Sequence, residues 1–425
     1  MNKKLLLILT MVVVILTPLV ADTPADLNPG TNPIYAQAGQ PYEGANIWSL
    51  SMGGAGLGMK GYSESFLKNP ANLPNQGFQI AVPAVTVTGY NIRKILESSM
   101  IDDFSSGDDD GIINGANEFL KLIKRGDGDI LTTDVTLLAL NVGGLGVALQ
   151  AQERLMTHKP TSDVTTIELI AQLTTAATVG FGYNIPIIED WLDIDVGVSA
   201  QFVYKGYLQG LSADSLITDM FDEGGDAFDF GSFFIGNRPF AGGWSLPITV
   251  GANVNGPWGL SLSMVGRNIN AKQYMTTYPS LNAWSIDTFG QPILDGDSGS
   301  GSTSTFEIDG KFTFDLGLTW SMNFGSNLLQ PTISLDFIDF GQMAELDGDE
   351  LSRAFWSTTR FGASVRVLNI LDFRYGLNKG YQSIGLGIDL FVFHLDVAYY
   401  TLEYGSTLGK KPIDALSVRI GLLSR

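Results

Sequence analysis

The two histidines, His158 and His394, have the widest chemical range in this chain, which contains no cysteine. His394 and Asp396 lie two positions apart, so on a strand their side chains share one face. A hydrolase with a serine nucleophile needs a base beside that serine, and no spacing in the sequence links His394 to a serine such as Ser417. We therefore expect His394 to be a hydrogen-bonded interior residue, and we expect neither an enzyme nor a bound cofactor.

Three arginines near the C-terminal end could hold a carboxylate group. Arg366, Arg374 and Arg419 lie in alternating segments and share the parity of nearby aspartates. A guanidinium group can bind a carboxylate through two parallel hydrogen bonds, so one of them could receive an acidic ligand in an interior. Opposite charges on adjacent strands also pair with one another, and such pairs hold a wall together or tether a neighbouring segment. The residue types leave both roles open.

Three acidic runs could bind Ca²⁺, which prefers oxygen ligands. They lie at 108–110, 295–297 and 347–350. None has the ligand spacing of an EF-hand loop. We expect these runs to be solvated loops, and the sequence predicts no metal site.

Aromatic residues gather in two long segments without sustained strand alternation. Apolar side chains in segments that face water need either a core of their own or a ligand. The residues that could form a hydrophobic ligand site there are Phe221, Phe230, Phe233, Phe234, Tyr274, Trp284 and Phe289. Packing of these side chains against one another is the alternative.

Alternating strands must position all these residues, and the segment 311–322 shows the pattern best. Apolar and polar side chains alternate along it, which indicates a strand with one apolar face and one polar face. The pattern recurs from residue 78 to the C-terminal end in about 14 segments. The predicted strands are 78–92, 132–141, 145–156, 170–184, 191–208, 244–254, 257–269, 311–322, 330–340, 357–367, 370–377, 381–390, 393–403 and 413–423.

Segments of this length can cross a bilayer as tilted strands. Hydrocarbon offers no partner for a backbone amide, so spanning strands must close into a barrel. The long connections, 93–131, 209–243, 270–310 and 341–356, all follow odd-numbered strands, as expected for external loops opposite short turns. The predicted fold is therefore all-β, a transmembrane antiparallel β-barrel of about 14 strands.

Composition agrees with this fold and excludes other classes. Of the 425 residues only 16% are charged, whereas Gly (50), Phe (24) and Tyr (14) are abundant, as in barrels with small interior residues and aromatic girdles. The net charge of -19 argues against a nucleic-acid partner, because an acidic surface repels phosphate. Without cysteine there is no disulfide framework and no thiolate metal site.

Residues 1–21 are predicted to be a secretory signal peptide. Two lysines precede an apolar run from Leu5 to Val20, and a small residue follows it. A membrane anchor helix is the alternative, although the run is short for one. Residues 22–77 then form an irregular segment that is rich in proline and glycine.

Two motifs in this segment carry a family resemblance. Ser51-Met52-Gly53-Gly54-Ala55-Gly56 is followed by Asn69-Pro70-Ala71 just before the first predicted strand. A signal peptide, these motifs and a long alternating chain together resemble the FadL/TodX family of outer-membrane long-chain fatty acid transporters and its PorV-like relatives. The resemblance implies that 22–77 is a hatch inside the lumen of a 14-stranded barrel formed by 78–425. The hatch residues it singles out are Gly53, Gly54, Gly56, Asn69, Pro70 and Ala71.

The resemblance also implies passive uptake of long-chain fatty acids or other hydrophobic small molecules across the cell outer membrane. In that family the third and fourth external loops capture the fatty acid, which then passes to a site in the lumen. We expect a monomer surrounded by outer-membrane lipid. The alternatives are a PorV-like component of a protein secretion or cell-surface assembly system, a surface-exposed adhesin, and an open porin. One departure is the end Leu422-Leu423-Ser424-Arg425, which lacks the terminal aromatic residue usual in outer-membrane barrels.

Overall fold

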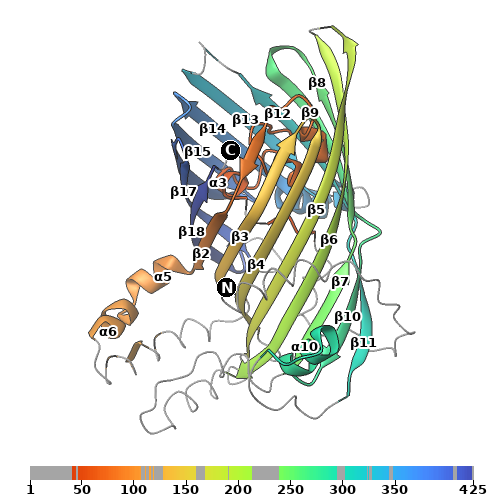
Figure 1. Cartoon of the computed structure of the whole chain (residues 1–425). Helices are drawn as coiled ribbons and strands as arrows, with labels where there is room; N and C mark the ends of the chain where they lie inside the picture. The colour runs from red at the N-terminus through yellow and green to blue at the C-terminus, as the bar shows by residue number, and fades with distance from the viewer. Residues whose placement is uncertain are drawn as a thin grey trace.

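A computed structural model describes residues 41–44, 46–106, 111, 114–115, 118, 128–158, 168–189, 191–212, 239–293, 302–322, 324, 328–343, 348–404 and 409–423. The strands among them form one antiparallel barrel (Figure 1). The predicted signal peptide lies outside the described residues.

Eighteen strand segments build the wall, and each pairs antiparallel with its neighbours. They are β1 (Gln79–Ala81), β2 (Ala84–Tyr90), β3 (Gly128–Val142), β4 (Leu145–His158), β5 (Glu168–Ile188), β6 (Leu192–Ser212), β7 (Phe240–Ser245), β8 (Ile248–Asn255), β9 (Leu260–Ile269), β10 (Lys272–Tyr278), β11 (Ser304–Asp309), β12 (Thr313–Ser321), β13 (Leu329–Phe337), β14 (Thr359–Val367), β15 (Leu371–Asn378), β16 (Tyr381–Leu390), β17 (Phe393–Glu403) and β18 (Pro412–Leu422).

Four of the strands are interrupted, so these segments make 14 strands around the barrel. β1 continues into β2, β7 into β8, β9 into β10, and β11 into β12, and both parts of each lie along shared neighbours. β18 pairs with β2 and closes the barrel. Closure removes the free sheet edges, as a membrane interior requires. The predicted antiparallel barrel of about 14 strands is confirmed.

Residues that cannot continue a regular strand mark the interruptions. Pro83 has no N–H to give to the ladder between β1 and β2, and Pro247 has none between β7 and β8. Asn270 adopts a φ of 57° between β9 and β10. A side chain at Gly310, between β11 and β12, would lie 1.8 Å from the carbonyl oxygen of Ala271. The breaks are therefore local consequences of the sequence.

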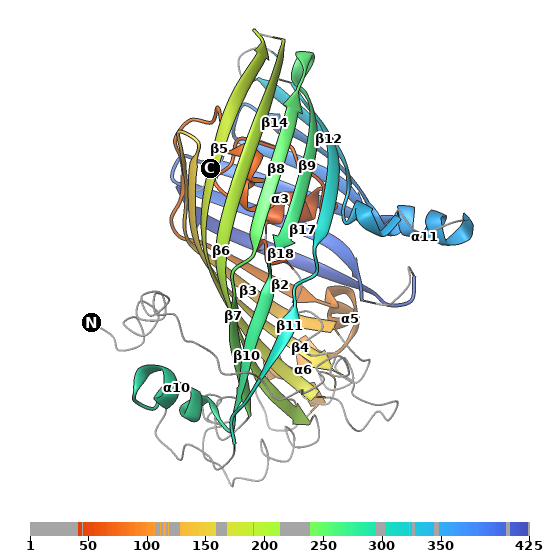
Figure 2. The same ribbon diagram turned by 90° about the vertical axis from the view of Figure 1, so that its right-hand side faces the viewer.

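The wall is taller on one side than on the other (Figure 2). β5 and β6 have 21 residues each, whereas β15 has eight. β10 and β11 pair with each other inside the segment 270–310, so the prediction that this whole segment is a loop is wrong. The breaks at Asn270 and Gly310 separate two short alternating runs from the longer strands and hide their strand character.

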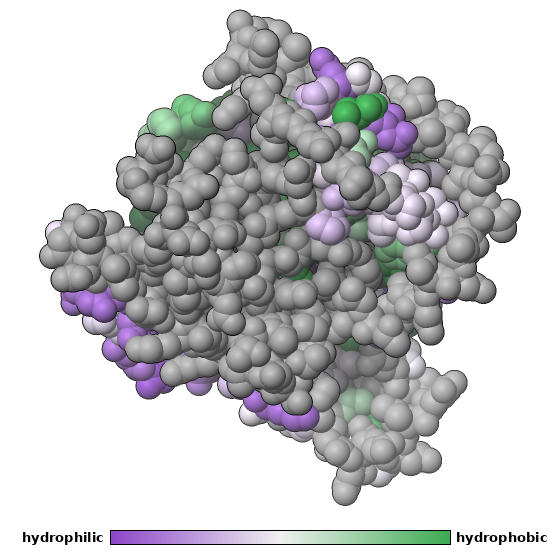
Figure 3. Space-filling view, turned by 90° about the horizontal axis from the view of Figure 1, so that it is seen from below, coloured by the Kyte–Doolittle hydropathy of each residue, from purple (hydrophilic) through white to green (hydrophobic). Residues whose placement is uncertain are grey.

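Helices lie inside the barrel and at its ends. They are α3 (Ile47–Ser51), α4 (Ser65–Lys68), η3 (Pro70–Asn72), α5 (Ile92–Glu97), α6 (Met100–Ser106), η5 (Pro257–Gly259), α10 (Leu281–Phe289), η6 (Phe340–Met343) and α11 (Gly348–Thr358). Within the described part of the chain, none is both long and apolar enough to span a membrane. Helices α5, α6 and α10, which belong to two of the long connections, lie toward the lower end in Figure 1. Seen from below, hydrophilic described residues lie along parts of the rim, with smaller apolar areas between them (Figure 3).

The two faces of the wall differ in polarity. Along β9, Leu260, Leu262 and Met264 are exposed on the outside, whereas Ser261 and Ser263 are buried on the inside. An apolar exterior suits hydrocarbon, and a polar interior suits a lumen. The barrel therefore has the surface of a membrane protein.

The described residues between 41 and 77, here called the inner segment, lie inside the barrel. Their helices α3, α4 and η3 pack against the inner wall (Figure 1). A side chain at Gly376 on β15 would lie 2.1 Å from the carbonyl carbon of Met52, and one at Gly197 on β6 would lie 2.3 Å from that of Pro70. Glycine at these wall positions lets the two backbones approach closely.

Candidate functional site

Asn69 fixes the inner segment to the wall. Its amide group donates hydrogen bonds to Asn253 Oδ1 on β8 (2.8 Å) and to the carbonyl oxygen of Leu57 (3.1 Å). Its side-chain oxygen accepts a hydrogen bond from the N–H of Ala71 (3.0 Å). Pro70 begins η3, where its missing N–H leaves no bond unmade. The Asn-Pro-Ala motif is therefore one turn held against β8, and its role as part of a hatch stays a prediction.

The glycine motif also lies against the wall. Gly53, Gly54 and Gly56 have φ angles of 70°, 84° and 110°, in the left-handed region that favours glycine. A side chain at Gly53 would meet the backbone of Leu377 at 2.6 Å. Both conformation and space therefore require glycine at Gly53.

Charged contacts connect the same segment to several strands. The backbone N–H groups of Gly56 and Leu57 donate to the buried carboxylate of Asp336 on β13, at 2.7 and 2.8 Å. Lys60 forms an ion pair with Asp195 on β6. Hydrogen bonds to an ionised group are about twice as strong as those between neutral groups, so these contacts hold the segment across the lumen.

Two of the three predicted arginines pair with wall carboxylates. Arg374 Nη1 lies 2.7 Å from Asp396 Oδ1, and Arg366 Nη2 lies 2.5 Å from Asp389 Oδ2. Trp48 of α3 covers both, with the guanidinium carbons of Arg374 and Arg366 at 4.1 and 5.0 Å from its ring centroid. These are cation–π distances. The contacts are those of a tether, and binding of a ligand carboxylate by these arginines stays a prediction.

The third arginine, Arg419, pairs with the inner segment itself. Its Nη2 lies 2.9 Å from Glu64 Oε2, and both side chains are buried. Glu64 also accepts a hydrogen bond from Thr136 at 2.5 Å. Nearby in α4, burial lowers the pKa of the Lys68 ammonium group, although the Asp336 carboxylate opposes this effect. The inner segment therefore brings its own ionisable groups into the lumen.

His394 belongs to the same polar group on the inner wall. Its Nε2 lies 2.5 Å from Asp396 Oδ2, and its Nδ1 contacts Asp389. The hydroxyl of Ser417 instead hydrogen bonds with Thr88 (2.6 Å) and Tyr400 (3.1 Å). Because carboxylates engage both ring nitrogens, His394 and Ser417 do not form a nucleophile and base pair.

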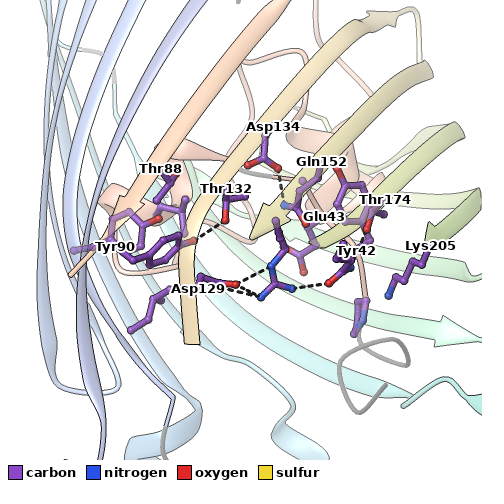
Figure 4. A pocket seen from close by; sticks show the side chains of 17 residues that line it. Tyr42, Glu43, Thr88, Tyr90, Asp129, Thr132, Asp134, Gln152, Thr174 and Lys205 are labelled. Carbon is purple, nitrogen blue, oxygen red and sulfur yellow. Dashed lines mark hydrogen bonds and ion pairs between the residues drawn. The ribbon is translucent and has the colours of Figure 1, made fainter. Parts of the chain in front are cut away.

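A cavity of about 360 Å³ lies between the inner segment and the wall (Figure 4). Residues 41–44 line it from within, and side chains of β2 to β6 and β17 line it from the wall. Arg154 holds Asp129 with two hydrogen bonds from Nη2, at 2.8 and 2.9 Å. Lys205 lies on the side opposite Asp129 and is only 4% exposed. The cavity wall therefore has polar as well as apolar surface, and its polar part carries both signs of charge.

An apolar cluster adjoins this polar lining. Met156 on β4 and Tyr207 on β6 also face the lumen. They follow Arg154 and Lys205 by two residues, in the direction of the long connections. The buried cluster, here called the apolar layer, is Met156, Ile170, Tyr207, Ala241, Met275 and Phe306. One inward-facing step is about 7 Å along a strand. The lumen thus changes from apolar to polar over a distance that suits a molecule with an apolar tail and a polar head.

Three of the aromatic residues predicted to bind ligand pack on the outer face of the wall. Trp284 Nε1 donates to the hydroxyl of Tyr204 (2.7 Å), and the Trp284 ring lies 5.5 Å from that of Phe289. Trp244 pairs with Tyr204 and with Tyr274 across the ladder, and its ring lies 4.9 Å from that of Tyr274. These rings form a small core beneath α10, and their binding of ligand stays a prediction. The other predicted residues, Phe221, Phe230, Phe233 and Phe234, lie outside the described residues.

The sequence interpretation missed the polar lining of the cavity. Arg154 and Lys205 lie inside the predicted strands 145–156 and 191–208, and their parity alone would have placed them inward. Asp129 lies before the predicted start of its strand at 132, so alternation gave no signal for it.

Comparison with known proteins finds solved structures of similar shape. No family model matches the sequence, and no curated protein matches it. The P. putida toluene transporter TodX is 10% identical with a TM-score of 0.42, covering 89% of this chain and 97% of its own. A Pseudomonas aeruginosa FadL homologue is 13% identical with a TM-score of 0.42, covering 89% and 98%. The translocator domain of the autotransporter NalP from Neisseria meningitidis is 11% identical with a TM-score of 0.32, covering 82% and 88%.

Proposed function

We propose that this protein is an outer-membrane conduit through which hydrophobic or amphiphilic small molecules diffuse, with long-chain fatty acids as ligands. One observation carries the proposal: a closed barrel encloses a cavity between an apolar layer of its wall and a segment fixed across its lumen. The volume of about 360 Å³ falls in the range of roughly 300–1,000 Å³ found for small-molecule sites. On this proposal the mature chain is a monomer of the outer membrane, exported by residues 1–21.

The ligand would lie with its carboxylate in the polar cavity and its chain along the apolar layer. Lys205 supplies a buried amino group that can donate hydrogen bonds to the carboxylate of the head group. Met156 and Tyr207 begin the surface for the chain. Each buried methylene contributes about 0.8 kcal/mol, so half of a long acyl chain supplies about 6 kcal/mol before the cost of ordering the ligand. Micromolar binding corresponds to about 8 kcal/mol, and the carboxylate contact would supply the remainder.

The inner segment would act as the hatch of this conduit. It crosses the lumen on the far side of the cavity from the long connections, and Asn69, Gly56 and Glu64 each hold it to a different part of the wall. A ligand in the cavity therefore needs a shift of this segment, or an opening beside it, to continue. Such passage down a gradient uses no cofactor and no energy source.

Binding of a fluorescent fatty acid and of its uncharged alcohol to the purified protein tests the proposal. We expect Lys205→Met to weaken binding of the acid at least tenfold and of the alcohol less than threefold, because only the acid has a carboxylate for the Lys205 amino group to bind. Lys272→Met is the matched control, since Lys272 is a half-exposed lysine on β10 that pairs with Glu307. Equal loss for acid and alcohol, or no binding of either by the native protein, would refute the proposed site.

A further inference from the structure

Bulky apolar residues occupy the tips of three of the short turns. Trp258, Leu368 and Phe391 have φ angles of 61°, 55° and 53°. In this left-handed region glycine and asparagine are favoured, and large side chains are strained. The three side chains are also exposed: Trp258 by 79%, Leu368 by 58%, and Phe391 completely.

The hairpin tip at the opposite end of β15 follows the ordinary chemistry of such turns. There Lys379 and Gly380 have φ angles of 52° and 84°, a polar residue followed by glycine, as two-residue hairpins prefer. Like Lys379, Trp258 and Leu368 each precede a second residue in the left-handed region, Gly259 (φ 77°) and Asn369 (φ 58°). Trp258 and Leu368 therefore carry two free-energy costs, the strain of the left-handed backbone and the exposure of an apolar side chain to water. An apolar environment around these tips would remove the second cost and so offset the first.

The exposed tips continue the apolar outer wall. Phe391 precedes the outward-facing Phe393 and Leu395 of β17, which are exposed by 59% and 39%. Leu368 follows β14 directly. Apolar tips occur on three separate hairpins, β8–β9, β14–β15 and β16–β17. These hairpins lie on the half of the barrel from β8 to β17, where the apolar outer wall that faces lipid continues onto the tips.

The height of the short side of the wall points to the same environment. β14 has nine residues, and at a rise of about 3.3 Å per residue and a tilt of about 40° it crosses only about 23 Å. An apolar band of about 25 Å is usual. The strand alone is slightly short, and Leu368 at its end supplies the missing step.

Helix α11 marks the other boundary of the same strand. It ends at Thr358, next to the first residue of β14, and projects sideways away from the wall (Figure 2). Its Leu351, Phe355 and Trp356 are exposed by 39%, 40% and 55%. A helix with exposed apolar side chains at the level where a spanning strand begins suits the plane of the membrane interface.

We infer that the tips of the short turns at Trp258, Leu368 and Phe391 are embedded in membrane lipid, and that α11 lies on the opposite interface. The bilayer then covers the short side of the wall from α11 to the tips. The longer strands β5, β6, β10 and β11 extend beyond it on the side of the long connections.

Single cysteine variants test this directly, because the natural chain has no cysteine. Phe391→Cys and Leu368→Cys are labelled with a nitroxide and reconstituted into phosphatidylcholine vesicles, and collision rates with oxygen and with a water-soluble nickel chelate are measured. Ile384→Cys on the outer wall, 54% exposed, is the lipid reference. Ser302→Cys, exposed before β11, is the water reference. Heat-modified mobility in a gel confirms that each variant folds.

We expect the two tip positions to match Ile384→Cys, with an oxygen to nickel collision ratio at least fivefold above that of Ser302→Cys. Nickel collision at the tips as frequent as at position 302 would overturn the inference. So would low access to both reagents, which would show that protein covers the tips. If Ile384→Cys itself reports water, the barrel does not lie in lipid and the inference fails with it.

Discussion

The carboxylate of Asp336 on β13 accepts a hydrogen bond from the backbone N–H of Gly56 at 2.7 Å, across 280 residues of sequence. The same oxygen accepts the N–H of Leu57 at 2.8 Å, and Ser334 donates to the other oxygen at 2.9 Å. Asp336 is completely buried. One wall side chain thus satisfies two backbone groups of the glycine motif, and its loss would release both.

Replacement of this carboxylate should loosen the inner segment. In Asp336→Ala the N–H groups of Gly56 and Leu57 lose their acceptor, at a cost of about 1–3 kcal/mol for each buried group left unpaired. We expect faster proteolysis within the inner segment and a higher conductance in planar bilayers. Asp309→Ala, at an exposed aspartate of β11, is the control. Identical proteolysis and conductance in both variants would contradict this role of Asp336.

A methyl group on the inner wall should destabilise the barrel where the inner segment touches it. In Gly376→Ala the new carbon would lie 2.1 Å from the carbonyl carbon of Met52, and overpacking of this kind costs about 1–3 kcal/mol. In Gly266→Ala the new carbon would meet Phe312 and Val250 at an ordinary 3.5 Å. We expect the first variant to lower the temperature of heat-modified gel mobility and the second to leave it unchanged or raise it. A fall of equal size in both would show that contact with the inner segment is not the cause.

The buried pair of Glu64 and Arg419 should be strongly coupled. Arg419→Met leaves the Glu64 carboxylate without its partner, and breaking a buried ion pair costs about 3–5 kcal/mol. We expect the double variant with Glu64→Gln to lose much less than the sum of the single losses in the free energy of unfolding by urea. Arg93 and Glu97 on α5, exposed by 77% and 63%, should show a coupling below about 0.5 kcal/mol. Additive losses for the buried pair would refute the coupling.

Alternation predicted the wall well because each strand separates lipid from lumen, and this demand leaves a period of two in the residues themselves. The predicted strands 381–390 and 393–403 coincide with β16 and β17. Boundaries were predicted poorly where a break interrupts a strand, because the short run beyond the break is separated from the longer pattern. All of β10, which begins at Lys272 just beyond the break at Asn270, was missed in this way.

The partners of interior charges could not be predicted from the sequence. Parity placed Arg366 inward, but its pairing with Asp389 on β16 depends on the register of β14, β15 and β16 together. Likewise, Glu64 meets Arg419 only because the inner segment folds back into the lumen. Such contacts are set by closure of the whole barrel, and no local pattern records them.

Two variants in the aromatic core beneath α10 can distinguish a structural role of Trp284 from a role in ligand binding. In Trp284→Ala the hydrogen bond to Tyr204 and the ring contact with Phe289 are both lost, and removal of a buried tryptophan costs about 3–5 kcal/mol locally. Tyr204→Phe keeps the rings and loses only the hydrogen bond, at about 1 kcal/mol. We expect hydrogen exchange in α10 to rise strongly in the first variant and slightly in the second, while affinity for a fluorescent fatty acid falls less than twofold in both. A tenfold loss of affinity in Trp284→Ala, with Tyr204→Phe unaffected, would instead support the ligand-binding role predicted for Trp284.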